Sequence, residues 1–316
     1  MRLSRPFFQL PLLFDVERLR AEVAALPPEA WVEHPDRAPG NSAVRLITAG
    51  GGENDGVQGC MAPTPWLESM PYLKQALAGF GVVWSRSRLM CLAPGASVPE
   101  HADINYHWHT RVRLHIPVFT WPEVRFHCDG ETVHMGAGEA WVFDNWRRHH
   151  VENNASGARV HLVADTTGTA GFWRFVHAPA PSRDQWRTVS WDPKASHPLL
   201  TEINQRSPIM PAAEVQWLLE DLKGELALAV DSPEARRRAG LFIQLLDGFV
   251  FDWRQLCALH GVDGEAATEF QRLAMAVRDA AAPLGEGLVM RTNGAGALLA
   301  LEKRVLLHLV AEDAPR

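Results

Sequence analysis

Between residue 81 and about residue 178, short runs of β-branched and aromatic residues alternate with Gly, Pro, Asn and Asp. Within residues 111–118 the even-numbered positions are all aliphatic, whereas positions 111, 113 and 115 are Arg, Arg and His. Residues 159–164 alternate in a similar way. Successive side chains of a strand point to opposite faces, so each strand has one apolar face and one polar face. This pattern is typical of a small barrel or jelly roll that holds a ligand in its mouth.

A cluster of histidines lies in the same segment. Nine of the 14 histidines fall between residues 101 and 161, so several of them must be ordinary polar or pocket-lining groups. His101 and Asp103 are separated by one residue, which places both side chains on one face of an extended segment. A second histidine from a later strand, His149 or its neighbour His150, would complete a two-His, one-carboxylate triad. Such a triad binds non-haem Fe(II) and leaves coordination positions open.

Arg159 follows ten residues after His149. The turn-forming run at 153–157 predicts a hairpin whose arms carry these two side chains opposite or diagonal to each other on one face. This parity favours His149 over His150. A guanidinium binds a carboxylate through two parallel hydrogen bonds, so Arg159 is suited to the end of a dicarboxylate. Together these residues predict a 2-oxoglutarate-dependent oxygenase.

The composition excludes several other classes of protein. Of the 316 residues, 47% are hydrophobic and 22% are charged, which is ordinary for a soluble globular protein. The net charge of -6 and the absence of a Lys/Arg-rich run argue against nucleic-acid binding. No apolar run approaches the roughly 18 residues of a membrane span. The four cysteines are widely spaced, which favours free thiols in a reducing compartment. We therefore expect a cytoplasmic protein.

Helical patterns lie on both sides of the strand-rich segment. Residues 16–25 and about 67–77 predict two helices near the N-terminus. From about residue 197 the apolar residues follow a helical period, as at 215, 218, 219, 222 and 226. Further helices are expected near residues 236–246, 253–259, 266–281 and 297–310. We interpret this part as a small helical domain for packing or dimerisation, so a homodimer through the C-terminal helices stays open.

Over roughly residues 85–170, the motifs resemble the aspartyl/asparaginyl β-hydroxylase family of Fe(II)/2-oxoglutarate oxygenases. The matching pieces include L-A-P-G at 92–95, R-V-R-L-H at 111–115 and the spacing F-D-x(4)-H-x(9)-R-x(5)-D from Phe143 to Asp165. The chain is also similar to bacterial proline 3-hydroxylases, through residues 71–74, 85–88, 133–135 and 138–139 and through its helical C-terminal part.

The resemblance implies an α+β protein with a double-stranded β-helix (jelly-roll or cupin-like) core, flanking N-terminal helices and a C-terminal helical domain. We place the oxygenase domain at residues 1–195 and the helical domain at 196–316. The resemblance also implies roles for five residues: His101 and His149 as iron ligands, Arg159 at the distal carboxylate of 2-oxoglutarate, and Arg113 and His115 as further contacts of this co-substrate. Asp103, expected from the triad pattern, would be the third iron ligand. Animal members have Gly at the position of Asp103, and a co-substrate-binding serine aligns with Met90.

The implied reaction uses O2 to hydroxylate an unactivated C–H bond of an amino acid. The substrate is either free, such as proline, or an Asp/Asn-type residue in a peptide or bound to a carrier. Candidate substrate residues are His107, Trp108, Arg111 and His161. The first two belong to an aromatic insert at residues 104–110, which is either a lid over the substrate or a packed loop.

Two other classes of protein stay open. A cupin-type metal protein with non-oxidative chemistry or a sensing role would keep the three metal ligands but has no use for Arg159. A structural or interaction protein would depend on the helical domain alone, and the intact ligand set argues against it.

Overall fold

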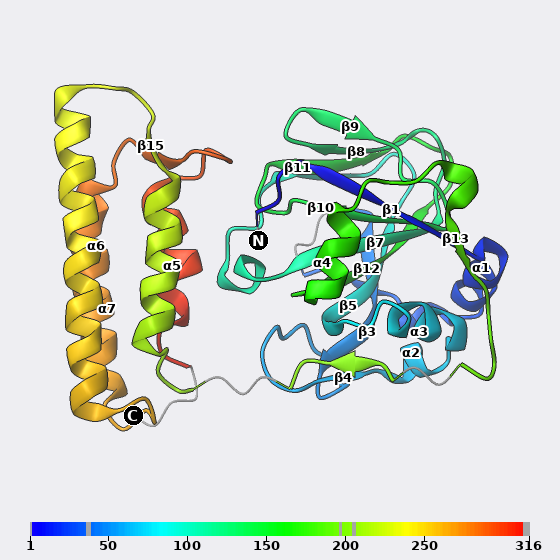
Figure 1. Ribbon diagram of the computed structural model, residues 1–316, viewed down its shortest axis with the longest axis horizontal. Helices are drawn as coiled ribbons and strands as arrows, with labels where there is room; N and C mark the ends of the chain where they lie inside the picture. Colours follow the sequence, from blue (N-terminus) through cyan, green and yellow to red (C-terminus); the bar gives the residue numbers. More distant parts are fainter. Residues whose placement is uncertain (1, 36–38, 196–197, 204–206, 312–316) are drawn as a thin grey trace. The chain divides into compact units, whose positions relative to one another are not determined.

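The computed structural model describes residues 2–35, 39–195, 198–203 and 207–311 (Figure 1). The chain divides into two compact units. The first comprises Met1–Ala102 and Thr110–Gln205, and the second comprises Asp103–His109 and Arg206–Arg316. A short segment within the expected oxygenase domain therefore belongs to the helical unit.

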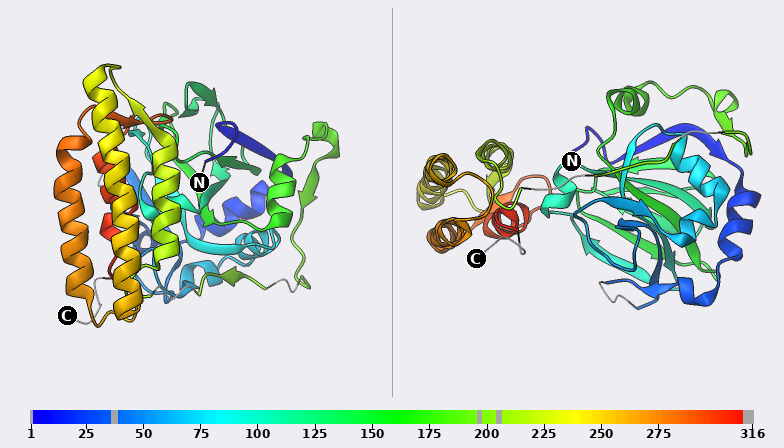
Figure 2. Two further views of the ribbon diagram at one scale, coloured as in Figure 1. Left: turned by 60° about the vertical axis from the view of Figure 1, so that its left-hand side comes forward. Right: turned by 90° about the horizontal axis from the view of Figure 1, so that it is seen from below.

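Eight consecutive strands, β5 to β12, form two antiparallel sheets at the centre of the first unit. The larger sheet has the order β10-β7-β12-β5, and the smaller sheet has the order β6-β11-β8-β9. The strands of the larger sheet are β5 (Val83–Leu92), β7 (Val112–Phe119), β10 (Glu139–Phe143) and β12 (Arg159–Thr166). Those of the smaller sheet are β6 (Ser97–His101), β8 (Val124–Cys128), β9 (Glu131–Val133) and β11 (His149–Asn153). Because the chain crosses repeatedly from one sheet to the other, this is a double-stranded β-helix, and the predicted fold class is confirmed (Figures 1 and 2).

Further strands extend the larger sheet on both sides to ten. On one side lie β1 (Phe7–Phe14) and β13 (Arg187–Val189), and on the other side lie β3 (Asn41–Ala49) and β2 (Val32–Glu33). The short strands β4 (Met61–Pro63) and β14 (Leu200–Thr201) pair with β3 and β5.

Four helices pack their apolar side chains against one face of the larger sheet. They are α1 (Val16–Ala24), α2 (Pro65–Glu68), α3 (Pro71–Ala78) and α4 (Ala170–His177). The single helix predicted at residues 67–77 is wrong, because the chain leaves the helical conformation at Met70 (φ -117°, ψ 75°). The residue before a proline is disfavoured in the α region, and Pro71 follows.

The alternation within β7 is confirmed. Val112, Leu114, Ile116 and Val118 have no exposed surface and belong to the core beneath the helices. His115 lies on the opposite face, where its ring makes an edge contact with Phe126 of the smaller sheet. The interior between the two sheets therefore carries the polar side chains of the larger sheet.

The hairpin predicted at residues 153–157 is wrong. β11 pairs with β6 and β8, whereas β12 pairs with β5 and β7, so this turn connects the two sheets. The side chain of Asn153 holds the crossing, since its Nδ2 donates to Leu92 O, Ala93 O and Gly157 O at 2.9, 3.1 and 2.9 Å. His149 and Arg159 consequently belong to different sheets.

The described residues of the second unit form four α-helices and a two-stranded sheet, and the helices are seen end-on in the right-hand view of Figure 2. The helices are α5 (Ala212–Glu225), α6 (Pro233–His260), α7 (Ala267–Leu284) and α8 (Ala297–Arg304), and the strands are β15 (Leu226–Leu228) and β16 (Leu288–Met290). The two helices predicted at 236–246 and 253–259 are one, because buried Phe249 and Val250 continue the apolar face between them. In the described part of the chain, no helix is both long and apolar enough to span a membrane.

Candidate metal centre

His101 and His149 face each other across two neighbouring strands. β6 and β11 pair antiparallel with these residues as direct partners, and the ring centroids are 4.3 Å apart. Asp103 follows His101 by two residues, and one ligand atom of each of the three side chains lies within 4.8 Å of the other two. The structure therefore brings the predicted triad together with the spacing that one metal ion requires.

Hydrogen bonds to the backbone fix which ring nitrogen each histidine presents. His101 Nδ1 lies 2.8 Å from Pro99 O, and His149 Nδ1 lies 2.8 Å from Arg147 O. A carbonyl oxygen only accepts, so Nδ1 is the protonated donor in both rings. The lone pair is then on Nε2, the atom left for a metal. Metal-binding histidines usually have their other nitrogen held in this way.

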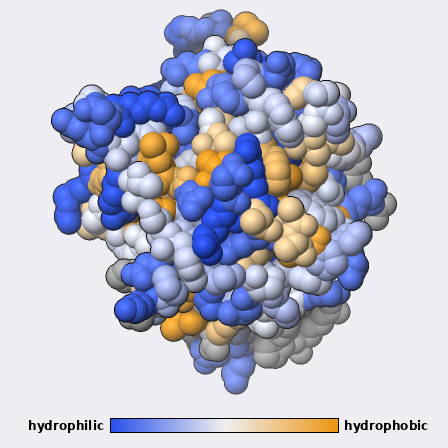
Figure 3. Space-filling view, turned by 90° about the vertical axis from the view of Figure 1, so that its right-hand side faces the viewer, coloured by the Kyte–Doolittle hydropathy of each residue, from blue (hydrophilic) through white to orange (hydrophobic). Residues whose placement is uncertain are grey.

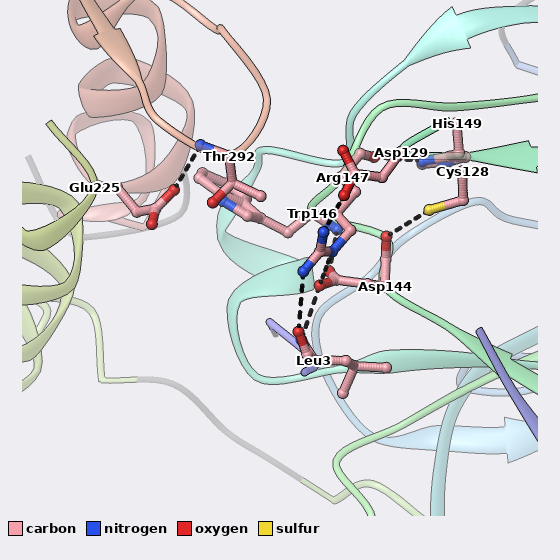
Figure 4. A network of polar contacts seen from close by, with 9 residues as sticks. All are labelled: Leu3, Cys128, Asp129, Asp144, Trp146, Arg147, His149, Glu225 and Thr292. Carbon is pink, nitrogen blue, oxygen red and sulfur yellow. Dashed lines mark hydrogen bonds and ion pairs between the residues drawn. The ribbon is translucent and has the colours of Figure 1, made fainter. Parts of the chain in front are cut away.

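The turn before His149 is held by a buried carboxylate, Asp144 (Figure 4). Its oxygens accept hydrogen bonds from Leu3 N at 2.8 Å, Trp146 N at 3.1 Å and Arg147 Nε at 3.0 Å. Arg147 also pairs with Asp129. Burial raises the pKa of Asp144, and the three hydrogen bonds oppose this rise. Asp144 thus fixes the segment whose carbonyl orients the His149 ring.

We expect Asp144→Ala to lower the free energy of unfolding by about 3 kcal/mol, because it leaves buried donors without their acceptor. Urea denaturation measures this loss. Asp129→Asn is the matched control, since Asp129 is exposed and pairs with the same Arg147. Loss of an exposed ion pair costs at most about 1 kcal/mol. Equal losses in the two variants would contradict the role of Asp144.

Aromatic rings surround the inner side of His149. The ring of Phe143 on β10 makes an edge contact with His149 at 4.8 Å, and Phe126 on β8 stacks with it at 6.3 Å. Phe126 and Phe143 belong to a small apolar cluster between the two sheets. This wall keeps the inner side of the triad dry.

Arg159 lies inside the same barrel, on β12, and is buried. Its Nη2 donates to His161 Nδ1 at 2.7 Å, and His115 Nδ1 lies 3.5 Å from His161 Nδ1. The Nε atom of Arg159 and the Nε2 atoms of His115 and His161 are buried without a hydrogen-bond partner among the described residues. Unpaired buried polar atoms are costly, so these three atoms indicate a polar ligand.

The other buried arginines of the described chain each have a carboxylate partner. Arg88 binds Asp55 at 2.5 Å, Arg111 binds Glu202 at 2.8 Å, and Arg304 pairs with Asp221. No carboxylate among the described residues pairs with Arg159. Burial lowers the pKa of Arg159 to about 9, so its guanidinium is still charged at neutral pH. A buried cation without an anion calls for an external one.

The two buried histidines beside Arg159 are neutral. Burial is the main cause that holds the pKa of His115 and of His161 well below 6.5, and the charge of Arg159 adds to it. Below pH 6.5 the unfolded chain takes up protons at these positions and the folded chain does not. Stability is therefore lost as the pH falls from 6.5 towards the lowered pKa values.

We expect His161→Gln to reduce this pH dependence below pH 6.5 by up to about 1.4 kcal/mol per pH unit, the largest share that one buried histidine can contribute. Urea denaturation of the metal-free protein at several pH values gives the slope. Leu77→Ala is the control, because it destabilises the core and keeps both histidines. An unchanged slope in His161→Gln would show that this histidine titrates alike in the folded and unfolded chain.

Comparison with known proteins bears on the same segment. Residues 57–168 match the family model described as Aspartyl/Asparaginyl beta-hydroxylase. The predicted resemblance to this family is confirmed. The matched segment contains all three members of the triad and Arg159. The curated proteins contain no match to this chain.

Several solved structures are similar to parts of the chain. A 2OG-Fe(II) oxygenase family oxidoreductase from Burkholderia pseudomallei shares 17% identity over 48% of this chain and 77% of its own, with a TM-score of 0.36. A Pseudomonas putida prolyl-4-hydroxylase shares 17% identity over 53% of this chain and 95% of its own, with a TM-score of 0.34. The cupin domain of Schizosaccharomyces pombe Cnp3 shares 11% identity over 28% of this chain and 60% of its own, with a TM-score of 0.23.

The remaining arginine candidates, Arg113 on β7 and Arg111 just before it, already have partners within the first unit. Arg113 Nε lies 3.5 Å from Asp165 Oδ1 on the neighbouring β12. Arg111 holds both carboxylate oxygens of buried Glu202 at 2.8 Å. A substrate role for Arg111 stays a prediction that this pairing does not support. No local sequence pattern indicates Glu202 as the partner, because it lies 91 residues away.

The aromatic insert forms a short 3-10 helix, η2 (Tyr106–His109), in the helical unit. The hydroxyl of Tyr106 donates to Glu214 of α5, and the ring of His109 contacts that of Trp217 at 4.3 Å. His109 Nδ1 also lies 3.7 Å from Asp221. His107 and Trp108 are buried. These contacts favour a packed loop over a lid, and a substrate role for His107 and Trp108 stays a prediction.

Other parts of the surface lie apart from this centre. A cleft of about 460 Å³ is lined by residues of β1 and α4 and by residues 79–80, and it includes none of the candidate site residues. On the face drawn in Figure 3, apolar residues form small separate groups between hydrophilic ones.

Proposed function

We propose that this chain is an Fe(II)/2-oxoglutarate-dependent dioxygenase that hydroxylates an unactivated C–H bond of an amino acid. The observation that carries the proposal is Arg159, a buried guanidinium whose only hydrogen-bonded neighbour, among the described residues, is a neutral histidine. A dicarboxylate co-substrate supplies the missing anion. If Arg159 were purely structural, we would expect an acidic residue beside it. This chain has such a residue beside Arg88 and beside Arg111.

The donor set of the triad fits iron. Two imidazoles and one carboxylate form the facial set typical of non-haem Fe(II) oxygenases, and Nε2 carries the lone pair in both histidines because Nδ1 donates to a carbonyl. His101, Asp103 and His149 would hold the ion. When bound, iron supplies the oxidative chemistry with O2 and 2-oxoglutarate.

The residues of this chain supply binding and orientation. Arg159 binds the distal carboxylate of 2-oxoglutarate through paired hydrogen bonds. His161 accepts from Arg159 through Nδ1, so its neutral ring carries the proton on Nε2 and can donate it to the same ligand. Phe126 and Phe143 exclude water beside His149.

A mass-shift screen tests the proposed substrate class. The protein is incubated with Fe(II), 2-oxoglutarate and air together with free amino acids, including proline, and with peptides that contain Asp or Asn. We expect a product about 16 Da heavier from one of these sets, with no product from Asp103→Ala. Succinate formation without a heavier product from any candidate would support the oxygenase activity but reject an amino acid as the substrate.

A cupin-type metal protein without oxidative chemistry is the second candidate. It is favoured by the triad but not by Arg159, because such a protein has no need for a dicarboxylate. Consumption of 2-oxoglutarate separates the two candidates.

A further inference from the structure

His150, the neighbour of His149, belongs to a second group of potential ligands. It lies on β11 directly opposite His127 on β8, and the two rings stack at 4.1 Å with an angle of 7° between their planes. Glu152 lies two residues further along β11, on the same face as His150. One ligand atom from each of His127, His150 and Glu152 lies within 4.8 Å of the other two.

The ring of His127 is held as a metal ligand would be. Its Nδ1 lies 2.8 Å from the hydroxyl of Thr132, its partner on β9. Its Nε2 is buried without a hydrogen bond among the described residues, and Glu152 Oε2 is 3.8 Å away. In the tautomer whose Nδ1 donates to the Thr132 hydroxyl, Nε2 presents a lone pair towards the carboxylate. A cation between the two would satisfy both groups.

The environment of this group suits a divalent metal ion, such as zinc, that binds both nitrogen and oxygen ligands. Burial, followed by the neighbouring His150, lowers the pKa of His127, which favours the neutral ring that binds metals. Arg125 lies opposite Glu152 and is the cation that opposes binding. The side chains of His127 and Glu152 are 25% and 43% exposed, so a bound ion would keep contact with water. Two imidazoles, one carboxylate and water form a common ligand set for zinc.

We propose that His127, His150 and Glu152 bind a zinc ion on the outer face of the smaller sheet. This site is separate from the triad, because His149 and His150 are consecutive residues of one strand and point to opposite faces. A zinc ion there links β8 to β11 on the face of β11 opposite the His149 side chain. The proposal does not depend on the proposed oxygenase activity.

Zinc titration of the full-length protein, with the bound metal measured after equilibrium dialysis, tests the proposal. We expect two zinc ions per chain in the wild type, since the triad also takes divalent ions. His150→Ala and Glu152→Gln should each lose tight binding of one ion, and combining His150→Ala with His101→Ala should lose both. Thr132→Val keeps all three ligands and should weaken the outer site roughly 10- to 100-fold, as the loss of a supporting hydrogen bond does elsewhere.

Glu131→Gln is the matched control, because Glu131 is exposed on the adjacent β9 and outside the ligand group. It should bind two ions, and all variants should have similar melting temperatures in EDTA. In zinc-soaked crystals, an anomalous peak should lie between His127, His150 and Glu152. A single zinc ion in the wild type that His101→Ala removes, or two in His150→Ala, would overturn the proposal.

Discussion

Replacing Arg159 by Ala should raise the 2-oxoglutarate concentration required for half-maximal turnover by roughly 30-fold or more. Truncating one partner of a buried, hydrogen-bonded charge pair costs about 2 to 5 kcal/mol, and each 1.4 kcal/mol corresponds to about tenfold in affinity. The concentration required by Arg159→Lys should lie between those of the wild type and Arg159→Ala, because an ammonium keeps the charge but loses the paired hydrogen bonds. The apparent KM for 2-oxoglutarate in a succinate assay measures the effect.

Iron content distinguishes this effect from general damage. Arg159 is not among the three metal ligands, so Arg159→Ala should keep nearly the wild-type iron content. Arg304→Lys is the control, since Arg304 is also buried but pairs with Asp221 in the helical unit. It should leave the 2-oxoglutarate requirement unchanged. A wild-type KM in Arg159→Ala would reject the role of this arginine.

Replacing His149 by Ala should remove iron and abolish turnover. Loss of a hydrogen bond behind a metal ligand already costs roughly 10- to 100-fold in metal affinity or activity, so the loss of a ligand should cost more. Iron analysis after dialysis and succinate formation measure the two effects.

His150→Ala is the matched control for His149→Ala. It removes the next histidine of the same strand, whose side chain stacks with His127 on the other face of the smaller sheet. It should keep the iron content and succinate formation of the wild type. Full activity in His149→Ala together with its loss in His150→Ala would reverse the assignment.

Local patterns made much of the first unit predictable. The alternation in β7 identified its buried face, because strand periodicity is a property of neighbouring residues. The spacing of His101 and Asp103 likewise predicted two ligands that lie close together, although β6 ends at His101 and Asp103 follows the strand. Which sheet each strand joins depends on pairing between distant residues, so the hairpin at 153–157 was predicted wrongly.

The same limit applied to the surroundings of the centre. Leu3 binds Asp144 across 141 residues, and His127 meets His150 through the register of two strands. Neither contact has a signature within a short window of sequence. The packing of η2 beside α5 has the same origin, since Tyr106 and Glu214 are 108 residues apart. Local sequence patterns thus predicted the metal ligands. The groups that hold these ligands come from distant parts of the chain and could not be predicted in this way.

Formation of succinate from 2-oxoglutarate tests the central claim most directly. The purified protein is incubated with Fe(II), ascorbate and 2-oxoglutarate in air, and succinate is quantified against parallel samples without Fe(II) or without O2. We predict succinate in the complete reaction, none in either omission, and none with Asp103→Ala. A protein that binds iron through His101, Asp103 and His149 but leaves 2-oxoglutarate intact under every condition, including with substrate candidates present, would contradict the oxygenase assignment.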